Sequence, residues 1–483
     1  MKSRASRAGR SWIAAALLAC APALVAPSCW FRDLDAYRGW TGMQLAATGR
    51  FRVEQVDGVW WLVTPDGHPF FSAGVNNVSW CTDWAAALDT CPYRDAVQAK
   101  YGSPEAWSDA VLARMEQWGL NTIGAWSEIA RFRGRFPYTQ ILALASGAPE
   151  IAGTAAPPLG GPLRDFFDPA FAAGAAAGAA SARECADDPW CIGVYSDNEL
   201  PWGPHFRQRL PFVDAYLKLP AGAPGKRALQ AFFEARWAGD LAAFNAAWRT
   251  SLADWDELQD LDALPVDFSA DTPPTRADRM AFRGHVAERY FRVAHDALRA
   301  VSPDLLILGA CFLAYGTGPD TAAAAAPWVD VVSVNPYEWN EAWTAAAVNS
   351  TRLNGLFPAG ALLDDVDAMY AVAGKPILIT EFGYRAEDAG LPNSWPPIYP
   401  TLPDQPARAD AYEGYLDRVL ARPWIVGAHW FEWADQPASG RFDGEDNNWG
   451  LVTIDDEPYP ELLLRMWSVH HSMYARRAAL ATP

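Results

Sequence analysis

Eight short apolar runs, each rich in β-branched or aromatic residues and each ending in polar ones, constrain the fold of this chain most strongly. The runs are Pro69–Val75, Thr122–Trp126, Gln140–Leu144, Ile192–Ser196, Leu305–Gly309, Val329–Val334, Pro376–Thr380 and Ile425–His429. Nearly continuous apolar runs are typical of parallel strands that are covered on both faces. Helical patterns lie between several of them; one is capped by Ser103, has Pro104 at its first position and Gly119 just past its end. The pattern predicts the α/β class and, within it, a (β/α)8 TIM barrel.

The chain divides into three predicted parts. Residues 1–28 are a signal peptide, residues 29–64 are an N-terminal extension, and residues 65–475 form the catalytic barrel. In the extension, Asp57-Gly58 between two apolar segments predicts a β-hairpin with a type I′ turn. A long insertion is expected between the fourth and fifth strands, and it contains a helix over Gln230–Arg249.

The N-terminus indicates export. Basic residues precede a short apolar run, Trp12–Leu18, which is too short to span a membrane. The sequence around Cys20 resembles a bacterial lipoprotein processing site, which would make Cys20 a lipid anchor in the outer membrane; cleavage by an ordinary signal peptidase near Ala26 is the alternative. The expected location is periplasmic, outer-membrane-anchored or extracellular.

Charge and cysteine content agree with an exported protein that binds no nucleic acid. The net charge is −18 and no basic stripe is present, so a phosphate backbone would be repelled. Cys81 with Cys91, and Cys185 with Cys191, are close enough in sequence to form two short disulfide loops. Free, buried thiols are the alternative. The 24 Trp, 16 Tyr and 22 Phe residues supply rings that either fill a core or stack on sugars.

Two glutamates lie where strands of the predicted barrel end. Glu199 follows the fourth strand and Glu381 ends the seventh. In a barrel of this type, the reacting groups sit at the carboxyl ends of the strands. A single glutamate at such a position is more often a structural ion-pair partner, but two carboxylates across one cleft are suited to glycosidic bond cleavage.

Other strand ends supply candidate sugar contacts. Each of these side chains alone is better explained by core packing or loop capping, but together at one rim they favour a substrate site. They are Asn198, Tyr337, Trp430, His429, Asn76, Trp126, Gln436, Arg441 and Glu445. The acidic loop that contains Glu445 does not have the spacing of an EF-hand, and neither a zinc motif nor a phosphate-binding loop occurs, so no metal and no cofactor are expected.

Three stretches of the chain resemble the β-agarases of glycoside hydrolase family 50, within the clan of retaining (β/α)8 glycosidases. They are Asp197–Gly203, Ser333–Tyr337 and Gly427–Pro437, the last followed by Gly440-Arg441 and Asp443-Gly444-Glu445. The resemblance implies Glu199 as the acid/base, Glu381 as the nucleophile and Asn198 as a contact to the sugar 2-hydroxyl. It also implies Tyr337 as support for Glu381.

This resemblance leads to specific expectations. A retaining mechanism requires the two carboxyl groups to be about 5–5.5 Å apart. Glu199 is expected to have a raised pKa, whereas hydrogen bonds, one of them from Tyr337, are expected to keep Glu381 ionised. The expected substrate is a β-linked galactan-type or related glycan.

Two features depart from the agarase pattern and favour an alternative substrate. Agarases of this family usually carry a sizeable N-terminal carbohydrate-binding domain, for which the 29–64 extension is too short, and an aromatic residue is expected before Tyr337, where Pro336 stands. The alternatives are a β-galactosidase or β-glucosidase acting on short oligosaccharides, or a surface lipoprotein that binds glycan without cleaving it. The sequence gives no indication of the oligomeric state.

Overall fold

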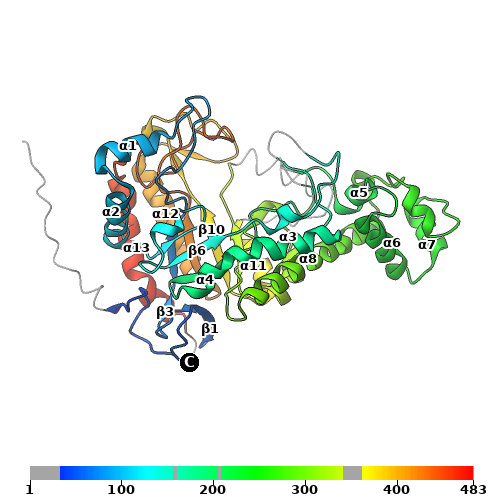
Figure 1. The fold of residues 1–483 in the computed structure, drawn as a ribbon, viewed down its shortest axis with the longest axis horizontal. Coiled ribbons are helices and arrows are strands. Elements are labelled where there is room, and N and C mark those ends of the chain that lie inside the picture. Colours follow the sequence, from blue (N-terminus) through cyan, green and yellow to red (C-terminus); the bar gives the residue numbers. More distant parts are fainter. Residues whose placement is uncertain (1–32, 156–159, 205–207, 341–361, 482–483) are drawn as a thin grey trace, which may run out of the picture.

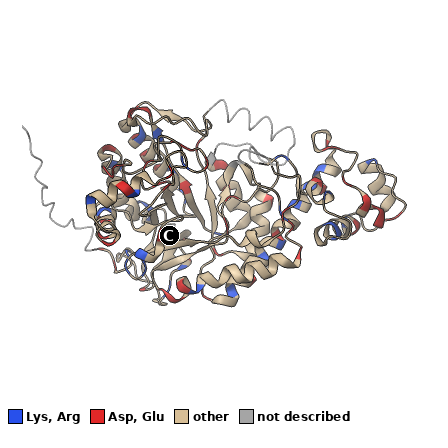
Figure 2. Cartoon of the chain, turned by 45° about the horizontal axis from the view of Figure 1, so that its top comes forward, with Lys and Arg blue, Asp and Glu red and all other residues tan. Residues whose placement is uncertain are grey.

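The computed structural model describes residues 33–155, 160–204, 208–340 and 362–481. The expected signal peptide and Cys20 lie outside these ranges. Across the described ranges, every helix is too short or too polar to cross a lipid bilayer. Acidic and basic side chains are interspersed over the helices that surround the central sheet (Figure 2).

The centre of the molecule is an eight-stranded parallel sheet in the order β7-β6-β5-β4-β13-β10-β9-β8. Its strands are β4 (Ser72–Val75), β5 (Thr122–Ile123), β6 (Tyr138–Ile141), β7 (Cys191–Tyr195), β8 (Phe312–Leu313), β9 (Val332–Asn335), β10 (Ile377–Phe382) and β13 (Ile425–Trp430). The sheet is curled, and the segment before β8 contacts its β7 edge. Val194 of β7 forms a parallel bridge with Ile307, and the Ser196 N–H donates to the Gly309 carbonyl, 2.8 Å away.

Helices cover the outside of the sheet (Figure 1). The α-helices of the described chain are α1 (Pro92–Tyr101), α2 (Pro104–Gln117), α3 (Pro169–Ala179), α4 (Arg183–Asp187), α5 (Phe212–Leu217), α6 (Pro224–Arg236), α7 (Leu241–Trp248), α8 (Pro273–Val301), α9 (Pro319–Ala325), α11 (Leu362–Ala373), α12 (Gln405–Leu420) and α13 (Pro460–Ala478). Helices α5, α6 and α7 lie at one end of the molecule, beyond the sheet. All three fall between β7 and β8 in the sequence.

Seven of the eight predicted runs overlap a strand of the central sheet, and the fifth does not. There, the predicted strand Leu305–Gly309 forms only a single bridge, and β8 begins after it, at Phe312. Gly309 and Cys311 have φ values of +86° and 42°, so the extended backbone is interrupted between the two segments. The third strand, β6, begins two residues before the predicted Gln140.

The helix predicted over Gln230–Arg249 is wrong as a single element, because it is divided into α6 and α7. Ala238 and Gly239 have φ values of 51° and 76°, which a right-handed helix does not allow. Asp240 then begins α7, and its carboxylate accepts the Ala243 N–H at 2.9 Å. In contrast, the predicted helix after Ser103 is confirmed, since Ser103 Oγ accepts the Ala106 N–H at 3.2 Å and α2 ends at Gln117.

A small antiparallel sheet precedes the central one. β1 (Arg52–Val56) pairs with β2 (Val59–Val63), and β2 pairs with β3 (Pro69–Phe70). Asp57 and Gly58, between β1 and β2, have φ values of 48° and 82°, as a type I′ turn requires. The small sheet crosses the predicted boundary at residue 64, because β3 runs almost directly into β4.

Both predicted disulfides are present. Cys81 is bonded to Cys91 and Cys185 to Cys191, with Cα–Cα distances of 5.8 and 5.3 Å. Cys311 is a free, buried thiol. The first disulfide closes the loop between β4 and α1, at the carboxyl edge of the central sheet.

Candidate active site

Glu199 is carried by the loop that follows β7. Its φ is 46°, and its N–H donates to the Cys311 carbonyl at 3.1 Å, so the backbone turns sharply at this residue. The loop is fixed on both sides of the glutamate. Before it, the buried Asp197 accepts hydrogen bonds from the Ala145 N–H at 2.9 Å and the Tyr290 hydroxyl at 2.5 Å.

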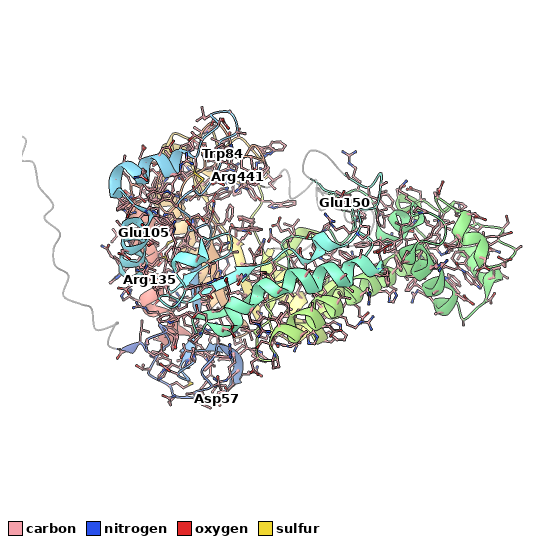
Figure 3. The ribbon with its side chains drawn as sticks, viewed as in Figure 1. Asp57, Trp84, Glu105, Arg135, Glu150 and Arg441 are labelled. Carbon is pink, nitrogen blue, oxygen red and sulfur yellow. A yellow bond between two sulfur atoms is a disulfide. The ribbon has the colours of Figure 1, made fainter. Side chains whose placement is uncertain are left out.

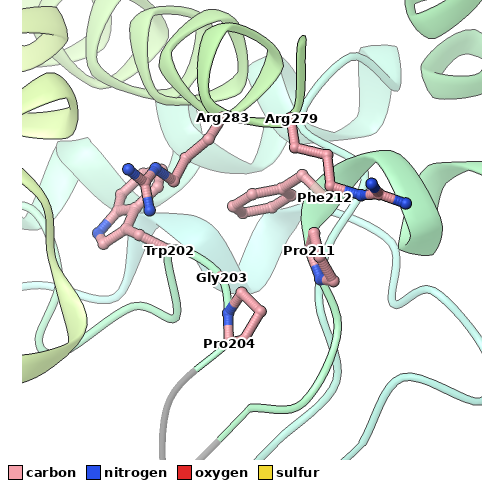
Figure 4. A pocket seen from close by; sticks show the side chains of 7 residues that line it. All are labelled: Trp202, Gly203, Pro204, Pro211, Phe212, Arg279 and Arg283. Atoms are coloured by element: carbon pink, nitrogen blue, oxygen red, sulfur yellow. The ribbon is translucent and has the colours of Figure 1, made fainter. Parts of the chain in front are cut away.

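After Glu199, the loop is anchored by Trp202, which is fully buried. Its ring stacks on Phe291 with centroids 5.7 Å apart. Figure 4 shows Trp202 beside Arg283, while Arg279 and Phe212 line the other side of the same small hollow. Arg279 and Arg283 are themselves engaged by Asp214 and Asp320, so this hollow belongs to the packing between the loop, α5 and α8.

Glu381 lies near the end of β10 and is only 6% exposed. Two hydrogen bonds hold its carboxyl group. Tyr337 donates from its hydroxyl to Oε2 at 3.0 Å, and Trp126 donates from Nε1 to Oε1 at 3.2 Å. The structure therefore places Tyr337 and Trp126, both predicted site residues, directly at the second glutamate.

Asn335 connects the two glutamates. Its Nδ2 donates to Glu199 Oε1 at 3.0 Å and to Asn198 Oδ1 at 3.1 Å. Its Oδ1 accepts the Thr380 hydroxyl at 2.5 Å, and Thr380 is the neighbour of Glu381. Asn335 was not predicted as a site residue, although it stands two positions before Tyr337 in the same motif.

The charge state of Glu381 differs from the expectation. Burial raises its pKa to about 8, and repulsion by Glu199 adds to the increase. The hydrogen bonds from Trp126 and Tyr337 lower the pKa but do not offset the loss of water. The prediction that hydrogen bonds outweigh burial at this carboxyl group is therefore not met, because burial dominates the pKa of Glu381.

Three of the predicted sugar contacts are buried instead. Trp430 and His429 are 1% and 0% exposed; Trp430 donates to the Trp449 carbonyl at 2.7 Å, and His429 Nε2 lies 2.8 Å from Ser72 Oγ. Burial lowers the pKa of His429 to about 3. Asn76 is also buried, and its Nδ2 donates to the Thr380 carbonyl at 2.8 Å. These side chains present no surface to a sugar and support the strands beneath the site.

The remaining predicted contacts form a buried ionic cluster beside the glutamates. Arg441 pairs with Glu445 at 3.0 Å and with Asp443 at 2.9 Å. Gln436 donates from Nε2 to Glu445 at 2.9 Å and to Glu432 at 3.0 Å. The positive charge of Arg441 lowers the pKa of Glu381, so the cluster is in electrostatic contact with this glutamate.

Two members of this cluster, Asp83 and Glu432, were not predicted as site residues. Asp83 lies 3.6 Å from Arg441, and Asn77 donates to the fully buried Glu432. Burial raises the pKa of Asp83 to about 6 and that of Glu432 well above its usual range. The sequence could have drawn attention to Asp83, because it lies inside the predicted Cys81–Cys91 loop. Only the fold, however, places that loop against the segment that follows β13.

Comparison with known proteins relates the chain to agarases. No protein-family model matches it. β-Agarase A of Vibrio sp. (strain JT0107) is 30% identical over 476 residues, which cover 87% of this chain and 45% of the agarase. β-Agarase B of the same strain is 28% identical, with 91% of this chain and 50% of the agarase covered. The chain thus spans about half the length of the curated relatives it matches.

The fold is likewise similar to that of a solved exo-β-agarase. That structure has a TM-score of 0.76 to this chain at 26% identity, and the match covers 92% of this chain and 68% of the agarase chain.

Proposed function

We propose that the chain is an exported glycoside hydrolase of the β-agarase type, with a (β/α)8 catalytic barrel, that cleaves β-linked galactan-type glycans. The observation that carries the proposal is the pair Glu199 and Glu381, which Asn335 and Thr380 connect at one edge of the sheet. The sequence similarity to two β-agarases supports the choice of substrate class. The basic and apolar leader supports export.

The proposed reaction is a double displacement with retention. The Glu381 carboxylate attacks the anomeric carbon while Glu199 gives its proton to the leaving glycosidic oxygen, so that a glycosyl ester forms on Glu381. Glu199, now ionised, takes a proton from water, which attacks the same carbon and releases the sugar. The reaction requires a proton on Glu199 and a charge on Glu381, where the hydrogen bonds from Tyr337 and Trp126 stabilise it. A separation of about 5–5.5 Å between the two carboxyl groups is expected.

Substitution of each glutamate tests this assignment. Glu381→Gln should lose turnover of agarose oligosaccharides, because the nucleophilic carboxylate is replaced by an amide. It should still bind them, because glutamine has almost the same volume as glutamate. Glu199→Gln should slow the same reaction by about 10²–10⁴-fold, since protonation of the leaving group is lost. Aryl glycosides with good leaving groups should still react with this variant in the first step, and added azide should release a glycosyl azide of unchanged anomeric configuration.

Glu105→Gln is the matched control. Glu105 is an exposed residue in the first turn of α2, and Figure 3 shows it away from Arg441. The control should retain the wild-type rate. A product of inverted configuration, or near-wild-type turnover by Glu381→Gln, would contradict the proposal; product chromatography and NMR of the first-formed anomer provide the readout.

A further inference from the structure

The geometry points to a second sugar-binding surface next to the catalytic pair, formed by the exposed rings of Trp84 and Phe442. Its ligand is a neutral glycan chain whose sugar rings stack on these two side chains. This inference rests on the proposed function and deepens it, because it assigns residues that bind the part of the glycan outside the reacting bond.

The rings of Phe442 and Trp84 are both exposed on the surface of the protein. Phe442 is 72% exposed and Trp84 is 42% exposed, whereas most large rings of the described chain are buried. Trp126, which holds Glu381, is also exposed, at 44%. The three residues belong to the loops that follow β13, β4 and β5, and these strands are neighbours in the sheet. The exposed rings therefore gather at one edge, the edge that carries the glutamates.

A continuous series of contacts connects Phe442 to the catalytic pair. The Arg441 guanidinium lies over the Phe442 ring at 5.3 Å and over the Phe431 ring at 5.6 Å. The Phe431 ring is 6.4 Å from that of Tyr337, whose hydroxyl donates to Glu381. Three successive side chains, Tyr337, Phe431 and Arg441, thus connect Glu381 to Phe442.

Trp84 is positioned near these contacts by Asp83, the residue that precedes it. Asp83, the preceding residue, is buried and lies 3.6 Å from Arg441, the residue that precedes Phe442. Figure 3 shows Trp84 and Arg441 together at the same end of the molecule. The Cys81–Cys91 disulfide closes the loop that carries Trp84. Both rings are thus attached to fixed backbone, which reduces the conformational entropy lost when a ligand binds.

The chemistry around the rings selects a neutral carbohydrate. Sugar rings present apolar C–H faces that pack against the flat face of an aromatic side chain. Asp443 and Glu445 add carboxylate oxygens that accept hydrogen bonds from hydroxyl groups. Arg441 already pairs with Asp443 and Glu445, so its guanidinium is not free to bind the anionic group of a sulfated or uronic-acid glycan.

Chain-length dependence tests the inference. Binding of agarose-derived di-, tetra- and octasaccharides is measured by calorimetry in the Glu381→Gln background, which prevents turnover. Phe442→Ala and Trp84→Ala should each weaken octasaccharide binding by about 3- to 10-fold, the size of one aromatic contact, and should weaken disaccharide binding less. Phe442→Trp should restore the octasaccharide affinity, because it restores a ring.

Trp467→Ala is the matched control, since Trp467 is 41% exposed on α13, away from the catalytic pair. It should leave binding of every oligosaccharide unchanged. If the wild type cleaves agarose oligosaccharides but Phe442→Ala and Trp84→Ala bind all lengths like the control, the surface is refuted while the proposed function stands. If the wild type neither binds nor cleaves any of them, the proposed function fails and the inference fails with it.

Discussion

At the scale of single residues, the position of Glu381 shows how burial and hydrogen bonding compete. A carboxyl group that is 6% exposed loses most of its hydration, and this effect dominates its pKa. Tyr337 and Trp126 each supply one donor, which favours the ionised form. The balance raises the pKa of Glu381 to about 8, which favours a proton on this carboxyl group. A glycosidase needs a proton on its acid, because the leaving oxygen must receive it.

The pH profile of the reaction follows from this balance. We expect kcat/KM to fall above a pH of about 8, where both glutamates become ionised and no acid remains. Tyr337→Phe removes a donor that favours the ionised form, so it should move this alkaline limb upward by up to about one pH unit and lower kcat. Rates of oligosaccharide hydrolysis measured from acidic to alkaline pH provide the check. An alkaline limb that stays in place or moves downward in Tyr337→Phe would exclude this role of the hydroxyl.

At the scale of elements, two loops from neighbouring strands form one rim. The loop after β4 contributes Asn77 and Asp83, and the segment after β13 contributes Glu432 and Arg441. Asp83 and Arg441 form an ion pair, and Asn77 donates a hydrogen bond to the buried Glu432, so loss of one partner leaves a buried polar group without compensation. The Cys81–Cys91 disulfide limits the conformations of the first loop in the unfolded chain as well as in the folded one.

The two disulfides should therefore differ in function more than in stability. The double substitutions Cys81→Ser with Cys91→Ser, and Cys185→Ser with Cys191→Ser, should each lower the free energy of unfolding by about 2–4 kcal/mol, as expected for short loops. Only the first should also weaken octasaccharide binding, because only that loop carries Trp84. Urea unfolding and calorimetry measure the two effects. Equal losses of affinity in both variants would show that the first loop has no specific role.

At the scale of the whole molecule, the last helix joins the small N-terminal sheet to the central one. Arg477 of α13 is fully buried, and its Nη2 donates to the Trp60 carbonyl at 2.7 Å. The guanidinium also lies over the rings of Trp61 and Phe71, at 4.9 and 5.0 Å. Arg477 thus connects the C-terminal helix to residues near the N-terminal end of the described chain.

Replacement of that side chain should destabilise the entire fold. Arg477→Met keeps most of the volume but leaves the Trp60 carbonyl without its donor, so we expect a loss of about 3 kcal/mol in the free energy of unfolding. Arg476→Met, one residue away, removes only a partly exposed pair with Asp417 and should cost less than about 1 kcal/mol. Thermal and urea unfolding of both variants measure the difference. Equal effects would mean that Arg477 contributes no more than a surface charge.

Local rules allowed several features to be predicted from the amino-acid sequence by itself. Apolar runs located most strands, Ser103 and Pro104 located the start of α2, and Asp57-Gly58 located the first hairpin, because these signals act within a few residues. The positions of Glu199 and Glu381 after their strands were also predictable. Parallel strands bring their carboxyl ends to one edge, so residues far apart in sequence are expected there together.

Only the tertiary structure decided which side chains at that edge remain accessible. His429 and Trp430 are covered by segments far from them in sequence, whereas Trp126 stays exposed at Glu381. The Asp83–Arg441 contact likewise required two loops to be packed against each other, and the pKa of Glu381 depends on how much water that packing removes. Burial is the sum of contacts from many distant residues, and no local pattern encodes that sum.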